Sequence, residues 1–281
     1  MSNAIIESTW PARGGFVSNG SFENTTYNED WTISSGCTIK KNTTYYVHGS
    51  NSAETYRSTG SGSLYVDQTI ANPSYFAGKR CTLLGRARTT GEGKTGNIIL
   101  NYGTSLSEWS NRTAGGTGNF EYLRASVLLP DTIAWLKVRL RFGVPNIGPI
   151  IYWDAISLVL GDTYGRVEID ESHIFPIGKP ESVPSGSVIL ADGEIAGVED
   201  NIVVIDRRFR YEAIEETLYL KLRNFYRYVA CGMSYEFTYT DTDGVAYAAR
   251  MMSDCFSDTE EIGPGLYNTT LSLRLTDRGI I

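Results

Sequence analysis

The stretch CGMSYEFTYTDTDGVAYAARMMSDCF, residues 231–256, predicts a β-hairpin together with its register. The run from Asp241 to Gly244 is a turn signal, because Gly244 is free to take positive φ after a type I turn. If Asp241 and Val245 close the turn, one face of the hairpin is apolar, and a slip of one residue would break that pattern. This register gives three pairs on the apolar face and one charge pair on the other: Phe237–Ala249, Tyr239–Tyr247, Tyr235–Met251 and Glu236–Arg250.

The composition and the charge distribution indicate two β-rich domains. A chain of 281 residues is long enough for two cores, and its Gly, Ser, Thr and Tyr content favours strands over helices. Residues 1–161 carry 14 Lys and Arg against 11 Asp and Glu, about +3, whereas residues 162–281 carry 11 against 21, about −10. The acidic second half argues against nucleic acid as a partner, and the first half is too weakly basic to argue for it.

The N-terminal sequence predicts synthesis and folding in the cytoplasm. The start, MSNAIIESTWPARGG, has neither a basic segment nor an apolar segment of a signal peptide. No run approaches the roughly 18 apolar residues of a membrane span. We therefore expect no membrane span.

The four cysteines show no metal-binding or redox spacing: Cys37, Cys81, Cys231 and Cys255. In the hairpin register Cys231 lies opposite Cys255, so a cross-strand disulfide is conceivable. Two buried thiols are the favoured alternative, because folding in a reducing cytosol keeps cysteines reduced.

The first half predicts a β-sandwich of the jelly-roll type over residues 14–161, preceded by an N-terminal arm, residues 1–13. Polar and apolar residues alternate in KRCTLLGRAR, residues 79–88, and in WLKVRLRF, residues 135–142. In the second run Lys137, Arg139 and Arg141 point one way and the intervening apolar residues the other. This alternation is typical of a sheet with one solvent-exposed face, and many such short strands indicate a sandwich or jelly-roll.

Four motifs in order resemble the jelly-roll carbohydrate-binding modules attached to bacterial polysaccharide-degrading enzymes. They are NGSFEN (residues 19–24, with Trp31 soon after), GSGSLYV (60–66), WLKVR (135–139) and YWDAISL (152–158). The resemblance covers about half of the chain and implies sugar binding. A jelly-roll also serves as a spacer or a protein-contact surface, so that alternative stays open.

The resemblance also implies a structural calcium ion between the first and last strands. The matching ligands are the carboxylates of Glu23 and Asp154 and carbonyls near Ser21 and Gly60. Oxygen ligands from distant segments suit calcium. The alternative is that Glu23 and Asp154 are ordinary hydrogen-bonding carboxylates at strand ends, and the sequence leaves both open.

Exposed aromatic rings are the candidates for sugar contact, because the C–H faces of sugars stack on rings. Trp109 stands out, since residues 105–118 form a long polar loop with little else to cover a tryptophan. Trp31 and Trp153 are expected in the core. The full candidate set is Tyr45, Tyr46, Tyr75, Tyr102, Trp109 and Tyr122.

The second half predicts a small α+β domain, residues 162–281, consisting of a strand, one helix, the hairpin and a last strand. GDTYG, residues 161–165, marks the boundary, and residues 176–196 are expected to form loops with short strands. Residues 202–205 read as a buried strand. Apolar residues at helical spacing run from Ile214 to Val229, and Cys231-Gly232 ends that helix. The last strand alternates through residues 267–275.

Three segments of this half resemble a region of tail proteins from tailed bacteriophages: LRNFYRYVACG (222–232), FTYTDTDG (237–244) and YAARM (247–251). The resemblance implies a structural component of a virion tail or baseplate. Its partners would be other tail proteins and further copies of the chain, contacted through loops and edge strands. Host surface polysaccharide would be the partner of the jelly-roll during adsorption.

Catalysis finds little support in the sequence. The two histidines, His48 and His173, lie near no nucleophile or metal-ligand pattern. GEGKTG, residues 91–96, lacks the spacing of a phosphate loop and reads as a turn. We predict that the chain is not an enzyme. Two alternatives to a tail component that binds glycans stay open: a carbohydrate-binding protein outside a virion, and a virion protein that binds only protein.

Overall fold

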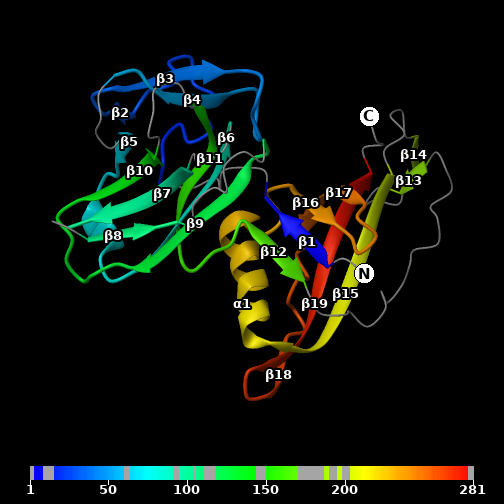
Figure 1. Ribbon diagram of the computed structural model, residues 1–281. Coiled ribbons are helices and arrows are strands. Elements are labelled where there is room, and N and C mark those ends of the chain that lie inside the picture. Colours follow the sequence, from blue (N-terminus) through cyan, green and yellow to red (C-terminus); the bar gives the residue numbers. More distant parts are fainter. Residues whose placement is uncertain are drawn as a thin grey trace. The chain divides into compact units, whose positions relative to one another are not determined.

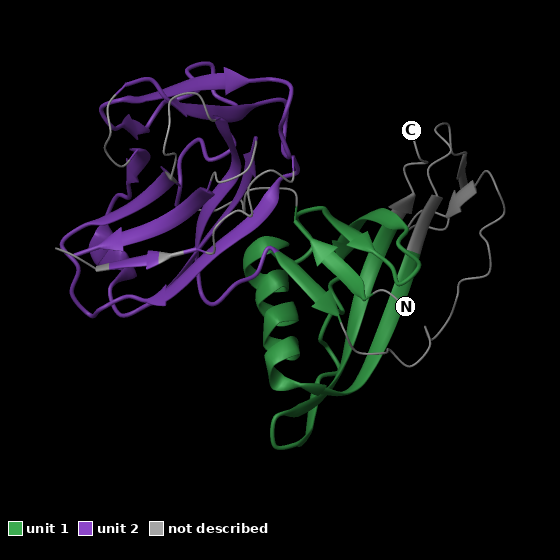
Figure 2. Ribbon diagram, in the orientation of Figure 1, with its two compact units in different colours: residues 1–8, 166–281 green, residues 9–165 purple. Residues whose placement is uncertain are grey.

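The structure, a computed structural model, divides the chain into two compact units (Figure 2). Unit 1 comprises Met1–Ser8 and Arg166–Ile281, and unit 2 comprises Thr9–Gly165. The fold is mostly β, as predicted, with antiparallel sheets and one α-helix in the described part of the chain. The structure describes residues 3–8, 16–59, 64–90, 95–103, 106–110, 118–143, 150–169, 187–189, 195–197 and 203–277.

Unit 2 is a jelly-roll-like sandwich of two five-stranded antiparallel sheets (Figure 1). The first, called the β10 sheet, has the order β2 (Thr32–Ile33), β5 (Leu64–Thr69), β10 (Leu136–Gly143), β7 (Thr95–Tyr102) and β8 (Leu106–Trp109). The second, called the β11 sheet, has the order β3 (Cys37–Asn42), β4 (Ser52–Arg57), β11 (Ile150–Leu160), β6 (Arg80–Thr89) and β9 (Glu121–Leu128). A 3₁₀ turn, η1 (Pro73–Phe76), connects β5 to β6.

One continuous core lies between the two sheets. Trp31 and Trp153 are buried in it, as predicted. The indole Nε1–H of Trp153 donates a hydrogen bond to Thr55 Oγ1 at 2.8 Å, so its polar group is satisfied inside the sandwich. Leu136, Val138, Leu140 and Phe142 of β10 all join this core, which confirms the predicted alternation of that strand.

Unit 1 is built on a seven-stranded antiparallel sheet with the path β12-β1-β16-β17-β19-β15, and β18 also pairs with β19. Its strands are β1 (Ala4–Glu7), β12 (Arg166–Ile169), β15 (Val203–Glu215), β16 (Phe237–Thr240), β17 (Ala246–Met251), β18 (Glu260–Gly263) and β19 (Leu266–Asp277). The helix α1 (Glu216–Asn224) continues into the π-helical turn η2 (Phe225–Val229). A separate hairpin joins β13 (Ser187–Ile189) and β14 (Ile195–Gly197).

The N-terminal segment belongs to the sheet of the second half of the chain. The sequence places residues 1–13 in an arm, whereas Ala4 to Glu7 pair with β12 on one side and β16 on the other. Ala4 and Ile6 are buried, so the alternation of this short strand inserts two side chains into the core of unit 1. Because Glu7 is in register with Arg166, the chain leaves and re-enters unit 1 at the same end of two paired strands.

The central pairs of the predicted hairpin are confirmed. Phe237 pairs with Ala249, and Tyr239 with Tyr247. Asp241 N–H donates to Val245 O at 3.0 Å, and Gly244 has φ 85° as the turn requires. The ladder begins at Phe237, so the predicted pairs Tyr235–Met251 and Glu236–Arg250 lie outside it. Met251 pairs instead with Leu273 of β19, because β17 has a second neighbour.

The helix is shorter than predicted. Ile214 lies in β15, where a bulge with Ala213 at φ 56° turns the strand before α1 begins at Glu216. Leu218, Leu222, Phe225 and Val229 are buried as expected, but the last two belong to the π-helical turn. The predicted buried strand at residues 202–205 is the start of β15, and the last predicted strand is β19. Most of residues 176–196 lie outside the described residues.

All four cysteines are free thiols. Cys255 is buried in a turn, and burial raises its pKa to about 12. Cys231 lies in the turn that follows η2, so the predicted opposition of these two residues across a hairpin does not occur.

Candidate functional site

Three polar rungs cross the outer side of the β10 sheet, on the face opposite the core. We call this surface the polar face. The register places Arg139 of β10 between Asp67 of β5 and Ile99 of β7. Side chains two residues apart along a strand share a face, so the neighbouring rungs also belong to it. The three rungs are Thr69–Lys137–Asn101, Asp67–Arg139–Ile99 and Tyr65–Arg141–Asn97.

The centre of the polar face is a stack of a ring, a guanidinium group and a carboxylate. Arg139 donates to Asp67 through two parallel hydrogen bonds, Nε to Oδ1 at 2.7 Å and Nη2 to Oδ2 at 2.8 Å. The guanidinium carbon lies 3.8 Å from the ring centre of Tyr65. The hydrogen bonds to Asp67 raise the pKa of Arg139, which keeps the guanidinium charged. This arrangement holds three planar groups in fixed positions, with Tyr65 and Arg139 partly exposed and Asp67 buried beside them.

The β7 side of the polar face is recessed from solvent. Asn97, Ile99 and Asn101 are buried although none of them points into the sandwich core. Asn97 Nδ2 donates to the carbonyl of Ser110, and Ser107 donates to Asn101 Oδ1. The face therefore grades from buried amides on β7 to half-exposed cations on β10.

Two of the predicted sugar-contact residues lie on the strands of this sheet. Tyr102 of β7 is buried in the core, so the prediction of an exposed platform there is wrong. It belongs to the apolar set of β7, which alternates with Asn97, Ile99 and Asn101. Trp109 pairs with Ile99 at the edge of the sheet, and its side chain lies outside the described residues.

Tyr45 and Tyr122 lie on the outer side of the β11 sheet, where arginines cover their rings. The guanidinium of Arg88 lies 3.5 Å from the ring centre of Tyr45, which also contacts Tyr152 edge-on. Arg86 covers Tyr122 at 4.8 Å, and the Tyr122 hydroxyl accepts from the N–H of Gly165. An arginine thus covers one face of each ring, as Arg139 does for Tyr65, and the further contacts of Tyr45 and Tyr122 lie within unit 2.

Tyr46 and Tyr75 are exposed as predicted. Tyr75 lies in η1, packs against Phe16 and Phe76, and has Lys79 Nζ 3.6 Å from its ring centre. The six predicted aromatic residues therefore do not form one cluster in the described part of unit 2.

The predicted calcium ligands are engaged by hydrogen-bond donors. Glu23 Oε1 accepts from the N–H groups of Ser50 and Asn51, both at 2.8 Å, and Oε2 accepts from their side chains. Asp154 Oδ2 accepts from the N–H groups of Val47 and His48 at 2.6 and 2.9 Å. Ser21 lies in the preceding turn, and Gly60 lies outside the described residues.

This donor set does not fit a cation. Each of the four carboxylate oxygens accepts from at least one protein N–H or O–H donor, whereas calcium needs free oxygen lone pairs. No group of three His, Cys, Asp or Glu residues suited to a metal occurs among the described residues. The structure therefore favours the alternative in which Glu23 and Asp154 fasten the segment 47–51 to the sandwich.

Asp154 is the most perturbed carboxyl group of unit 2. It is fully buried, and burial raises its pKa to about 7 despite the three N–H donors, with a further contribution from the charge of Glu23. The Ala155 N–H donates to Oδ1, and a bulge in β11 with Ala155 at φ 51° aims the carboxyl at residues 47–48. For Glu23 burial acts in the same direction, but the hydrogen bonds from Ser50 and Asn51 outweigh it and lower the pKa.

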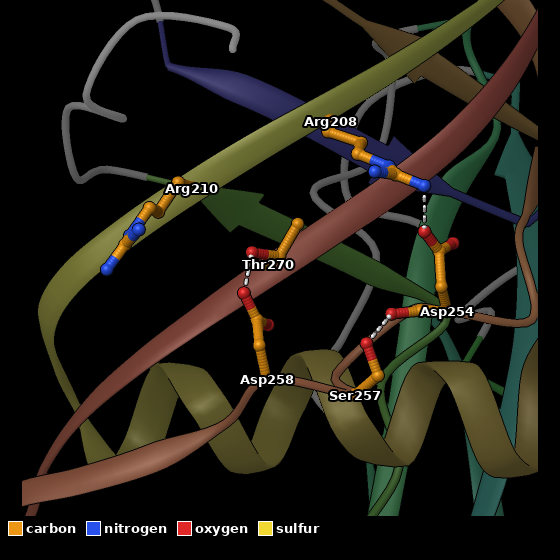
Figure 3. A pocket seen from close by; sticks show the side chains of 6 residues that line it. All are labelled: Arg208, Arg210, Asp254, Ser257, Asp258 and Thr270. Atoms are coloured by element: carbon orange, nitrogen blue, oxygen red, sulfur yellow. Dashed lines mark hydrogen bonds and ion pairs between the residues drawn. The ribbon is translucent and has the colours of Figure 1, made fainter.

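Unit 1 contains a polar pocket of about 200 Å³ between β15, β19 and the turn after β17 (Figure 3). Arg208 Nη2 lies 2.7 Å from Asp254 Oδ2, and Thr270 donates to Asp258 at 2.6 Å. The pocket is lined by Arg208, Arg210, Asp254, Ser257, Asp258 and Thr270. Its two arginines balance its two aspartates, and both aspartates already accept from residues of the pocket.

Sequence reasoning missed the members of the polar face other than its cations. The alternation of β10 indicated a wet face with Lys137, Arg139 and Arg141, but their partners come from strands about 40 and 70 residues away. Tyr65 lies within the GSGSLYV motif, residues 60–66, and Asp67 follows it directly, so this motif is the local signal for both.

Within the described residues, no helix has both the length and the apolar character needed to cross a bilayer.

No protein-family model and no curated protein matches this chain. Solved structures resemble about half of it. The C-terminal family 22 carbohydrate-binding module of Clostridium thermocellum Xyn10B is 16% identical, with 53% of this chain and 96% of that chain covered and a TM-score of 0.43. A family 16 carbohydrate-binding module is 17% identical, with 51% and 99% covered and a TM-score of 0.42.

The enzymatically active domain of bacteriophage CBA120 tailspike protein 4 is 19% identical, with 52% of this chain but 21% of that chain covered and a TM-score of 0.41. At these identities and TM-scores the likeness is distant, and no residue role is transferred from it.

Proposed function

We propose that unit 2 binds carbohydrate through the polar face of the β10 sheet. The observation that carries the proposal is the partly exposed pair of Tyr65 and Arg139, which the buried carboxylate of Asp67 holds in place. Sugar sites combine an aromatic surface with a few fixed planar polar groups, which hydrogen-bond adjacent hydroxyls. Here those groups are fixed by partners within the protein, so little side-chain entropy is lost on binding.

The binding experiment uses the full chain and a panel of host surface polysaccharides and plant xylans, measured by titration calorimetry. Tyr65→Ala should weaken binding at least about tenfold, the equivalent of about 1.4 kcal/mol. Tyr75→Ala removes an exposed tyrosine from η1, outside the polar face, and should leave the affinity unchanged. The proposal fails if no polysaccharide binds, or if Tyr75→Ala and Tyr65→Ala have equal effects.

We also propose that the chain is a structural component of a phage tail or baseplate, made in the host cytoplasm, with unit 1 as the assembly domain. The supporting observation is β15, a 13-residue strand that pairs only with β19 in the described part of the chain. Such an edge presents backbone N–H and C=O groups that another chain can pair with. Many copies on one particle would raise weak single-site sugar affinity by avidity.

Particle mass and negative-stain shape of the full chain across concentration test the assembly proposal. Rings or defined oligomers that persist when unit 2 is removed support it. A monomer at every concentration, alone and with tail proteins of the same virion, contradicts it and favours a carbohydrate-binding protein outside a virion. A protein that assembles but binds no polysaccharide is a purely structural virion protein.

A further inference from the structure

Among the described residues of the polar face, cations outnumber carboxylates. In the three central strands β5, β7 and β10, the charged residues are Asp67, Lys137, Arg139 and Arg141. Three cations therefore accompany one carboxylate, in a chain whose net charge is −7. The three cations occupy every second position of one strand, so their spacing is about 7 Å and the row is about 13 Å long.

We infer that the ligand of the polar face is an acidic polysaccharide that carries carboxylate groups, such as a uronic-acid chain. This inference rests on the proposed sugar-binding function and specifies its ligand class. Asp67 occupies the fork of Arg139 through Nε and Nη2. Arg139 is thereby held by Asp67, while Lys137 and Arg141 lie one rung away on either side.

A carboxylate ligand fits this row better than a neutral sugar. Lys137 is half-buried, and a ligand that covers it removes water from its charge. A neutral ligand has no opposite charge to offset this loss of solvation free energy. A ligand carboxylate at that position restores the lost solvation with a charge-assisted hydrogen bond. Asn97 and Asn101 are buried on β7 and bonded to Ser110 and Ser107, so they support the face rather than contact the ligand.

Nucleic acid is the less favoured polyanion. Binding of a duplex typically uses about 6–10 phosphate contacts. The polar face offers three cations, and Asp67 already neutralises one of them. The regular row instead suits an extended chain with a few well-separated charges.

The experiment compares an oligogalacturonide with the same oligomer after methyl esterification, which removes the charges and keeps the sugar framework. Titrations of the full chain at low and high salt are expected to give affinity for the acidic form at least about tenfold higher at low salt, with a smaller difference at high salt. A double-stranded RNA of equal charge is the third ligand and is expected to bind more weakly than the acidic oligomer.

The matched variants are Lys137→Gln, which removes a cation from the row, and Lys40→Gln, which removes one from β3 of the other sheet. Lys137→Gln should lower affinity for the acidic form about tenfold and leave the ester unaffected, because one charge-assisted contact is lost. Lys40→Gln should change neither. Thermal melting verifies that both variants fold.

The other possible outcomes separate the inference of an acidic ligand from the proposal that the polar face binds sugar. Equal binding of acid and ester, or equal effects of the two variants, overturns the inference and leaves sugar binding intact. RNA that binds as tightly as the acidic oligomer shows nonspecific polyanion binding and also overturns it. Binding of neutral polysaccharides alone overturns the acidic ligand class only, whereas no binding of any glycan overturns the proposed function as well.

Discussion

Arg139 and Asp67 lie directly opposite each other on neighbouring strands and share two parallel hydrogen bonds of 2.7 and 2.8 Å. A bidentate pair in this position joins β10 to β5 through side chains as well as through the backbone ladder. The Asp67 side chain is 9% exposed, so it lacks the water that would otherwise solvate its charge. Removal of either partner would leave the other poorly solvated.

Asp67→Asn is therefore expected to destabilise the protein by about 1–3 kcal/mol. The new amide group would direct N–H donors at a guanidinium that also only donates, so one of the two hydrogen bonds is replaced by repulsion. Urea unfolding at neutral pH measures the change. Asp131→Asn, at an exposed carboxyl in the same unit, is the control and should have little effect. Equal losses in the two variants would contradict the assigned role of the pair.

Asp154 predicts a pH dependence of stability. Its pKa in the folded protein is about 7, above the ordinary value of 3.8, so the native state binds more protons than the unfolded state between these values. The contribution of Asp154 to stability is full below about pH 4 and is lost as the pH rises through about 7. Each unit of pKa difference corresponds to about 1.4 kcal/mol.

The measurement is the free energy of unfolding of the wild-type protein and of Asp154→Asn at pH 5 and pH 8. The free energy of unfolding of the wild-type protein should fall relative to that of the variant between pH 5 and pH 8, since the variant has no titrating group at this position. Comparing the two proteins cancels the titration of all other groups. Parallel pH profiles would show that Asp154 does not titrate in this range.

The hydrogen bonds of Glu23 and Asp154 predict that calcium is not needed for stability. Addition of EDTA should leave the melting temperature unchanged, because the four carboxylate oxygens accept from protein donors. Glu23→Gln serves as the matched variant. A saturable rise in melting temperature with calcium that Glu23→Gln abolishes would show that the segment 47–51 rearranges around an ion.

The register between β1 and β12 predicts that unit 2 can be removed. Because Glu7 pairs with Arg166, an Asn-Gly turn in place of residues 8–165 would join the two strands as a tight hairpin. This shortened chain should fold and melt cooperatively, which circular dichroism and calorimetry would show. The control joins the same residues with Pro-Pro, which cannot form that turn. If the two shortened chains behave alike, unit 1 does not close through this hairpin.

Local signals in the sequence predicted local structure well. The turn at Asp241–Gly244 and the alternation on both sides determined the pairing of β16 with β17, and the alternation of β10 separated its core side from its polar side. The start of α1 was misplaced because Ile214 satisfies both a helical pattern and a buried strand position. The bulge at Ala213 keeps Ile214 in the strand, and the hydrophobic pattern of the sequence gives no sign of this bulge.

Nonlocal pairing explains what the sequence did not show. The stack of Tyr65, Asp67 and Arg139 depends on the alignment of strands about 70 residues apart, and β1 depends on partners more than 150 residues away. The aromatic set was predicted from ring type and, for Trp109, from the polar loop around it, and burial then removed Tyr102 from it. Residue type identified the chemistry of a sugar site, but strand order decided which residues meet.

The position of β1 also has a consequence during protein synthesis. The ribosome makes β1 before unit 2, whereas β12 and β16, its two neighbours, are made only after all of unit 2. Unit 2 can complete its sandwich during translation, because all its strands lie within one continuous stretch. The sheet of unit 1 must wait until β12 and β16 are made, so a ribosome that stalls directly after unit 2 would leave a folded sandwich attached to a β1 strand without its neighbours.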